Sequence, residues 1–450
     1  MAGLRNIIKN YCDVYSSLKR TIHLSVLTLV AKAIVLKLIT KTMKRRNFII
    51  VILLVNLIFV SCDFKTNDLE DTNLSQARIA RIDTMLNGYI NSGKLSGATV
   101  LISRNNQIAY LKSFGYNNII DSIPMKNDCI YGIASMTKLV TSVAAMILYE
   151  KGYFRINDKL SDYLPEFKNM SVYVNKEYGN SIKDADNPIL IKDIFRHTSG
   201  IKGITKEYRE VGADFSQVSS LSEFVQRISA VPLYHEPGTK FEYSSSTDIL
   251  ACLIERLSGQ TLREFFIENI FTPLEMDDTD FYIPKEKKDR LVSYYEFRND
   301  SLILKETYEN SKYKELPEFY RGGSGLVSTV EDYAKFLQML LNYGIYNDTR
   351  ILSRKTVELM KTDQLQNVDN KGFLSNGRGH GLGVGVIPDA GQYGELFSDG
   401  SIFWQGVRNT DFWIDYQENL FGILMTQMSP FRYLPYMEKY RILTYQAIYD

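Results

Sequence analysis

The sequence predicts an α/β (α+β) fold, in which a mainly antiparallel sheet is flanked by helices and interrupted by a helical insertion. Apolar runs typical of strands occur near residues 97–113 and again near 382–426. The region between them, from about 158 to 353, has the pattern of helices and loops. We therefore expect both chain ends to build one sheet of about five or more strands, with the middle of the chain inserted beside it.

The first elements follow from periodicity and turn residues. Apolar residues recur on one helical face over 76–93. Two strands, Ala98–Ile102 and Gln107–Leu111, are joined by a polar tetrapeptide and predict a hairpin. The short apolar run Cys129–Ala134 predicts a strand that leads into a long apolar helix, which begins at Ser135 and ends near Gly152.

The later elements are predicted in the same way. Leu250–Ser258 and Val330–Leu341 are the clearest helices of the insertion, and residues 434–448 form a last helix. We expect this last helix and the one near 76–93 to cover one face of the sheet. Turn residues separate five predicted strands: Gly383–Ile387, Tyr393–Phe397, Ile402–Gln405, Asp411–Ile414 and Phe421–Thr426.

Composition and charge exclude some classes of protein. The chain has 450 residues, of which 45% are hydrophobic and 23% charged, so it can bury a large core and is not disordered. It has 53 basic and 52 acidic residues; residues 1–62 hold ten basic and one acidic, which leaves 43 basic and 51 acidic for the rest. An acidic body of this kind is not expected to bind nucleic acid.

The basic charge belongs to an N-terminal leader. Residues 43–62 combine Lys44-Arg45-Arg46, an apolar stretch and a final Ser61-Cys62, which predicts a secretory signal. Its end, F-V-S-C, resembles a bacterial lipobox, so we expect lipidation at Cys62 and a membrane-anchored lipoprotein of the cell envelope, periplasmic or surface-exposed. A signal anchor that stays attached is the alternative.

The leader also sets the predicted domain boundaries. Residues 1–42 are interpreted as an upstream extension, with an amphipathic surface helix as the alternative. Residues 63–74 are polar and acidic and are interpreted as a tether, and 75–450 as the functional domain.

Neither cysteines nor histidines predict a metal site. The four cysteines have no CxxC spacing and the four histidines lie far apart, so we expect no metal and no cofactor. Cys129 and Cys252 lie in apolar segments, which favours core packing over a disulfide.

Ser135 and Lys138 form an S-x-x-K motif. A serine hydroxyl needs a neighbour that removes its proton, and positions i and i+3 of a helix share one face. A buried lysine can act as that base. The chain contains three other S-x-x-K matches, at Ser16, Ser199 and Ser311, but Ser135 has a predicted strand before it and a long apolar helix after it.

Two further segments carry residues that suit hydrolysis. Tyr243 follows a turn and an extended stretch, from which a tyrosine can relay a proton. Trp404-Gln405-Gly406 lies in a predicted strand, where the glycine lets a substrate lie against the backbone. As an isolated residue, Tyr243 could equally be one of thirty tyrosines and Trp404 a core aromatic.

The order of the motifs resembles a known family. The segments S-M-T-K, H-T-S-G, P-G-T-K-F-E-Y-S, G-G-S-G-L-V-S-T and W-Q-G are similar to those of the class C β-lactamase-like serine hydrolases, from about residue 79 to 448. That family includes β-lactamases, D-Ala-D-Ala carboxypeptidases, D-aminopeptidases and carboxylesterases. The resemblance implies a β-lactamase/transpeptidase-like fold for residues 75–450.

The resemblance also implies roles for single residues. Ser135 matches the acylated nucleophile, Lys138 its base partner and Tyr243 the family's proton-shuttling tyrosine. The backbone N–H groups of Ser135 and Val407 would form the oxyanion hole. Ser245 and Trp404-Gln405-Gly406 stand at the substrate-binding positions.

The histidines of two motifs are given no catalytic role. His197 is interpreted as part of a structural turn, and the segment that begins at Gly322 likewise. His380 is interpreted as packing.

Two departures from the pattern predict the substrate. Penicillin-recognising members have Asn at the position of Ser245, where it holds an amide carbonyl, and Lys at the position of Trp404, where it attracts a carboxylate. Their loss favours esters or small amides, hydrolysed through an acyl-enzyme. Arg408 could supply a substitute cation.

Other functions remain open at this point. A β-lactamase or a peptidase of cell-wall peptides is one alternative, and a catalytically silent relative that binds cell-wall fragments or a protein is another. The sequence does not predict the oligomeric state.

Overall fold

The computed structural model describes residues 72–174, 181–203, 205–368, 371–374 and 376–449, all within one compact unit, Thr66–Asp450. The predicted extension, leader and lipidated Cys62 lie outside these residues, as do all but three residues of the predicted tether. Among the described residues, no helix is both long and apolar enough to cross a membrane.

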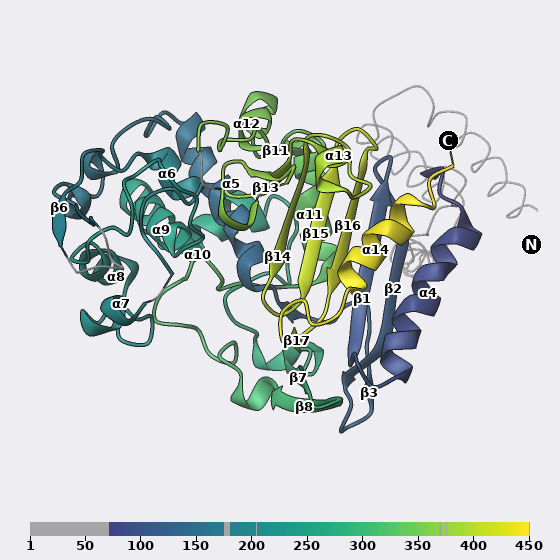
Figure 1. The fold of residues 1–450 in the computed structure, drawn as a ribbon. Helices are drawn as coiled ribbons and strands as arrows, with labels where there is room; N and C mark the ends of the chain where they lie inside the picture. The colour runs from purple at the N-terminus through teal and green to yellow at the C-terminus, as the bar shows by residue number, and fades with distance from the viewer. Residues whose placement is uncertain (1–71, 175–180, 204, 369–370, 375, 450) are drawn as a thin grey trace, which may run out of the picture. The chain divides into compact units, whose positions relative to one another are not determined.

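One large antiparallel sheet organises the chain (Figure 1). Its strand order is β12-β13-β14-β15-β16-β1-β2-β3, and each neighbouring pair is antiparallel. β16 pairs with β1, with Thr99 opposite Met425, so the two chain ends meet in the middle of the sheet as predicted. The strands are β1 (Gly97–Arg104), β2 (Gln107–Asn118), β3 (Ile123–Pro124), β12 (Gly379–His380), β13 (Gly385–Ile387), β14 (Ser401–Gly406), β15 (Thr410–Asp415) and β16 (Leu420–Met425).

Helices cover both faces of this sheet. As predicted, α4 (Gln76–Asn91) and α14 (Tyr436–Tyr445) lie side by side on one face, where they bury a core that includes Trp413. On the other face, α11 (Val330–Leu341) shares a larger core with α5 (Thr137–Glu150). The central strands are buried on both sides, because alternate residues of each strand enter opposite cores.

The insertion is mainly helical but not entirely so. Besides α11, it contains α6 (Ile191–Phe195), α7 (Lys206–Glu210), α8 (Leu221–Ile228), α9 (Ser246–Ser258) and α10 (Leu262–Phe266), and α12 (Arg354–Met360) follows directly after it. A separate sheet joins β7 (Tyr294–Arg298) and β8 (Ser301–Glu306) to β17 (Met428–Ser429). That hairpin was not predicted. α9 packs closely against α5, which brings the insertion to the edge of the main sheet.

One predicted strand was wrong, and a second was right only in part. Residues 393–397 do not form a strand: Asp389 caps a helical turn, α13 (Ala390–Tyr393), by accepting the Gln392 N–H at 2.8 Å, and Gly394 ends the turn with a φ of +81°. The run that begins at Cys129 forms only the two-residue β4 (Tyr131–Gly132), which pairs with β9 (Val327–Ser328) outside the main sheet. Cys129 and Cys252 are buried and unbridged, as expected.

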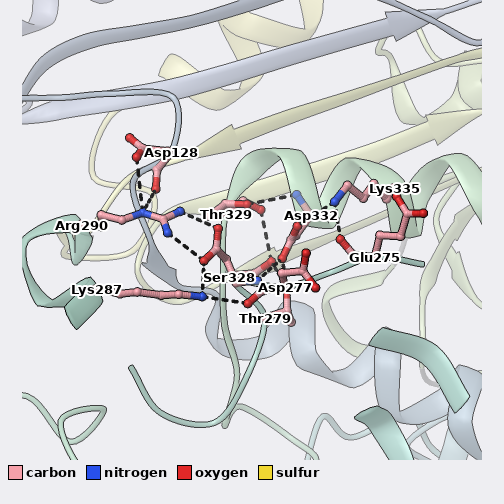
Figure 2. A network of polar contacts seen from close by, with 11 residues as sticks. Asp128, Glu275, Asp277, Thr279, Lys287, Arg290, Ser328, Thr329, Asp332 and Lys335 are labelled. Atoms are coloured by element: carbon pink, nitrogen blue, oxygen red, sulfur yellow. Dashed lines mark hydrogen bonds and ion pairs between the residues drawn. The ribbon is translucent and has the colours of Figure 1, made fainter. Parts of the chain in front are cut away.

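A polar network fixes the segments on either side of this short pair (Figure 2). Arg290 donates to both carboxylate oxygens of Asp278, at 2.6 and 2.8 Å, and to the Asp128 carbonyl at 2.8 Å. The Asp278 N–H in turn donates to Asp332, in the first turn of α11, at 2.7 Å. The network therefore ties the chain just before β4, which leads to Ser135, to the helix just after β9, which follows the segment that begins at Gly322.

Candidate active site

A sharp turn places Ser135 at the start of α5. Ala134 has a φ of +47°, in the left-handed region that residues with a Cβ rarely adopt. The turn continues as a short 3-10 helix, Ala134–Met136, and α5 begins at Thr137 rather than at Ser135. Strained backbone of this kind is common at functional sites, where it aims a reactive side chain.

Lys138 lies within hydrogen-bond reach of Ser135. Its Nζ is 3.3 Å from the Ser135 Oγ, and its side chain is buried. In the other two S-x-x-K matches that the structure describes, the lysine pairs with a glutamate instead: Lys202 with Glu242 at 3.1 Å, and Lys314 with Glu309 at 2.9 Å. The tertiary structure thus distinguishes Ser135 from motifs with the same spacing.

The glycine-rich segment that begins at Gly322 forms one wall of the site. Lys138 Nζ donates to the Gly323 carbonyl at 2.5 Å, and Thr141 Oγ1 donates to the Gly322 carbonyl at 2.7 Å. A Cβ at Gly322 would lie 2.7 Å from that of Ala251 and 3.0 Å from a methyl of Thr141, so a glycine is needed between α5 and α9. The sequence interpretation of this segment as a structural turn missed its contact with Lys138.

Tyr243 lies next to Lys138. The Lys138 Nζ is 4.9 Å from the centroid of the Tyr243 ring. The Tyr243 hydroxyl is buried and has no hydrogen-bond partner among the described residues. A buried hydroxyl without a partner is costly, and a substrate or water at the site would relieve that cost.

The end of β14 lies directly beside the turn that carries Ser135. A Cβ at Gly406 would lie 2.5 Å from the Ile133 carbonyl and 3.3 Å from the Ala134 Cβ, so a side chain here would push the strand away. Val407 follows in an exposed turn. This arrangement brings both predicted oxyanion donors, the N–H groups of Ser135 and Val407, into one region.

The remaining β14 residues point to opposite faces. Trp404 is buried on the Ser135 side, with its ring centroid 5.4 Å from that of Tyr243. Gln405 faces α14, where it accepts from Arg432 Nε at 2.9 Å and lies 3.9 Å from the Met437 sulfur. Its side chain is therefore directed away from Ser135, and a contact with substrate at this position would use the backbone.

Arg408 does not supply a free cation to the substrate-binding positions, because it is paired with Glu306. Its guanidinium bonds to both Glu306 oxygens, at 2.8 and 3.0 Å, and lies over the Tyr294 ring. This ion pair would have to break before Arg408 could bind a substrate carboxylate. Ser245, immediately before α9, is buried, and its carbonyl accepts the Asp248 N–H at 2.9 Å.

Two buried histidines surround Tyr243 and Trp404. The His197 ring lies 4.7 Å from that of Tyr243, and the His380 ring lies 5.3 Å from that of Trp404. Burial lowers the pKa of His197 well below its usual value, with smaller effects of His380 and Lys138, and burial lowers the pKa of His380 to about 4. Both rings are therefore neutral near pH 7 and pack as aromatic walls beside Tyr243 and Trp404.

His380 gives a prediction for stability. In the unfolded chain it binds a proton near pH 6.5, but in the folded chain only near pH 4. Between these two pH values the unfolded state binds more protons than the folded state. The contribution of neutral His380 to the free energy of unfolding is therefore complete above pH 6.5 and is lost as the pH falls towards 4. We expect His380→Phe to reduce the loss of unfolding free energy between pH 7.5 and 5.0 by about 2 kcal/mol, measured by urea denaturation. Equal losses in the two proteins would contradict this assignment.

A separate cavity of about 750 Å³ opens elsewhere on the domain. Its lining includes Tyr149, Lys192, Arg196 and Gln364, and none of the Ser135, Lys138 or Tyr243 side chains. The reactive groups, rather than the volume of this cavity, identify the candidate site.

An antiparallel sheet between two helical layers, with a serine and a lysine one helical turn apart at its edge, is characteristic of one class of proteins. The chain belongs to the beta-lactamase family, whose family model matches residues 80–446. This family comprises serine hydrolases, and its members similar to this chain include esterases.

Individual relatives are similar at modest identity. Protein Rv1367c of Mycobacterium tuberculosis is 29% identical over 357 residues, which cover 76% of this chain and 88% of that protein. Esterase EstB of Burkholderia gladioli is 24% identical over 382 residues, which cover 78% of this chain and 90% of the relative. Among solved structures, EstCE1, described as a hydrolase with promiscuous acyltransferase activity, matches with a TM-score of 0.69 and 22% identity, covering 82% of this chain and 99% of that one. This last likeness shows the fold.

Proposed function

We propose that the protein hydrolyses esters through an acyl-enzyme on Ser135. The observation that carries the proposal is the distance of 3.3 Å between the Ser135 hydroxyl, in the turn before α5, and the buried Lys138 amine, in the first turn of α5. No other S-x-x-K match that the structure describes has this contact between hydroxyl and amine. The similarity to an esterase over most of both chains supports the same reaction class.

The proposed chemistry uses the site's own groups. Lys138, as the neutral amine, takes the Ser135 proton while Oγ attacks the ester carbonyl carbon. The N–H groups of Ser135 and Val407 stabilise the oxyanion that forms. The C–O bond to the leaving group then breaks, and the alcohol leaves with a proton relayed by Tyr243. Water attacks the acyl-enzyme by the reverse proton path and releases the acid.

The walls of the site favour esters over β-lactams. Trp404 and Tyr243 present aromatic surface, and the exposed Phe373 adds to it with its ring centroid 6.3 Å from that of Tyr243. The lysine that attracts a carboxylate in penicillin-recognising relatives is replaced by Trp404, and Arg408 is paired with Glu306. Loss of a charge-assisted hydrogen bond removes about 1.5–3 kcal/mol, or roughly one to two orders of magnitude in kcat/KM.

A substrate panel tests the preference. We expect kcat/KM for p-nitrophenyl acetate and butyrate to exceed that for a chromogenic cephalosporin and for a D-Ala-D-Ala peptide by at least about tenfold. Efficient cephalosporin turnover with negligible esterase activity would contradict the proposed preference. Absence of labelling by a fluorophosphonate, together with inactivity on the whole panel, would instead support a silent relative that binds without catalysis.

We also propose that the mature protein begins at a lipidated Cys62 and is anchored in the cell envelope. The support is the basic, apolar and small-residue order of residues 43–62. Stable anchoring requires more than one acyl chain, as in multiply acylated lipoproteins. We expect Cys62→Ala to abolish incorporation of radiolabelled palmitate, while Cys129→Ala keeps it. Persistent labelling of the Cys62→Ala protein would refute the anchor.

A further inference from the structure

A buried carboxylate accepts a hydrogen bond from Gly323, the residue whose carbonyl accepts from Lys138. Asp248, in the first turn of α9, is 1% exposed. Its Oδ1 accepts the Gly323 N–H at 3.0 Å, and its Oδ2 lies 3.4 Å from Arg321 Nη2. A charge buried to this degree is costly unless it is bonded, so these contacts have to be maintained in the folded protein.

The carboxylate is packed tightly against Gly323. A Cβ at Gly323 would lie 2.7 Å from Asp248 Oδ2, so no other residue fits at this position without a shift. Gly323 is thus held on one side by Asp248, while its carbonyl accepts from Lys138 Nζ at 2.5 Å. The adjacent Gly322 carbonyl is fixed in turn by Thr141.

The Gly323 carbonyl controls how the Lys138 amine is oriented. When Lys138 is a neutral amine, one N–H can donate to this carbonyl, and the lone pair can then face the Ser135 hydroxyl. If the Gly323 backbone rotated, the amine would lose its fixed direction although Ser135 and Lys138 were both still present. A displacement of about 1 Å in such a group can lower the rate by about 100-fold.

We propose that Asp248 is a positioning residue, which holds the Gly323 backbone so that its carbonyl directs the Lys138 amine towards Ser135. Arg321 acts with it: its guanidinium lies 3.4 Å from the centroid of the Phe215 ring and neutralises the buried carboxylate from the solvent side. This role rests on the proposed acyl-enzyme function.

The test compares graded changes at Asp248 with a matched buried carboxylate. Asp248→Asn keeps an oxygen that can accept the Gly323 N–H, whereas Asp248→Ala removes it. Asp411 is the control, because it is also 1% exposed and also pairs with an arginine, Arg441 at 2.8 Å, but it lies on the α14 side of the sheet. Each variant is assayed for kcat and KM on p-nitrophenyl butyrate, for the rate of Ser135 labelling by a fluorophosphonate, and for Tm.

We expect Asp248→Ala to lower kcat and the labelling rate by about 10- to 100-fold, while KM stays within about twofold of wild type. Asp248→Asn should keep most of the wild-type kcat and most of the wild-type labelling rate. Asp411→Ala should lower Tm without lowering kcat in the folded fraction. Equal kcat losses in Asp248→Ala and Asp411→Ala, or unchanged labelling of a folded Asp248→Ala protein, would overturn the positioning role. If Asp248→Ala does not fold, a labelling rate of the Arg321→Met protein equal to wild type would overturn it as well. Inactivity and absence of labelling in the wild-type protein would overturn the proposed function instead.

Discussion

Replacing Ser135 with alanine is expected to abolish hydrolysis. The substitution removes the Oγ that would form the acyl-enzyme. Among the described residues, no second hydroxyl is hydrogen-bonded to the Lys138 amine. The residual rate would come from binding and from the oxyanion donors alone, so kcat should fall by at least about 10⁴-fold. Steady-state kinetics on p-nitrophenyl butyrate and the intact mass after fluorophosphonate treatment measure the two consequences.

The chain offers a matched control for this change. Ser311 is the serine of another S-x-x-K match, but its Oγ donates to Glu306 at 2.9 Å and its lysine pairs with Glu309. Ser311→Ala should therefore keep both esterase activity and the probe adduct. An adduct that persists in Ser135→Ala would show that another residue is the nucleophile.

Replacing Lys138 with methionine is expected to give the second largest loss. Methionine is close to lysine in length and suits a buried position, so the packing of α5 should be preserved. It cannot take the Ser135 proton, and it cannot donate to Gly323. A positioned base contributes about 10²- to 10⁴-fold, and we expect kcat/KM to fall by that amount while Tm changes little, since methionine fills the same buried space.

Lys202→Met serves as the control for this variant. Lys202 is also the lysine of an S-x-x-K match, but it pairs with Glu242 and lies over the Tyr234 ring. Its replacement should leave kcat/KM within a few-fold of wild type. If Lys138→Met keeps more than half of the wild-type kcat/KM, Lys138 is not the base, and Tyr243 becomes the candidate.

Much of the fold could be predicted because the spacing of apolar residues indicates which side chains of a helix or strand are buried. The helix Val330–Leu341 was predicted with the bounds that the structure shows, and the strands β14, β15 and β16 within one residue at each end. In each, the spacing of apolar residues matches the faces that are buried in the two cores. The prediction failed at residues 393–397, because an Asp389 cap and a following glycine favour a helical turn over the strand that their aromatic side chains suggest.

The sequence alone determined which residue types follow one another and with what spacing. The order of five motifs along the chain favoured Ser135 and Lys138 over the other S-x-x-K matches, and the structure places the two side chains in contact. The sequence also predicted a sheet built from both ends of the chain, since the alternation of apolar residues indicates each strand separately.

Only the tertiary structure decided which distant groups meet at that pair. Gly323 lies 185 residues from Lys138, and Asp248 lies 75 residues from Gly323, yet the three are joined by hydrogen bonds. Likewise, Arg408 could not be excluded as a cation until its pairing with Glu306, 102 residues away, was seen. The physical reason is that side-chain periodicity fixes which face of an element is buried, whereas the partner on that face depends on how α5, α9 and the sheet pack against one another.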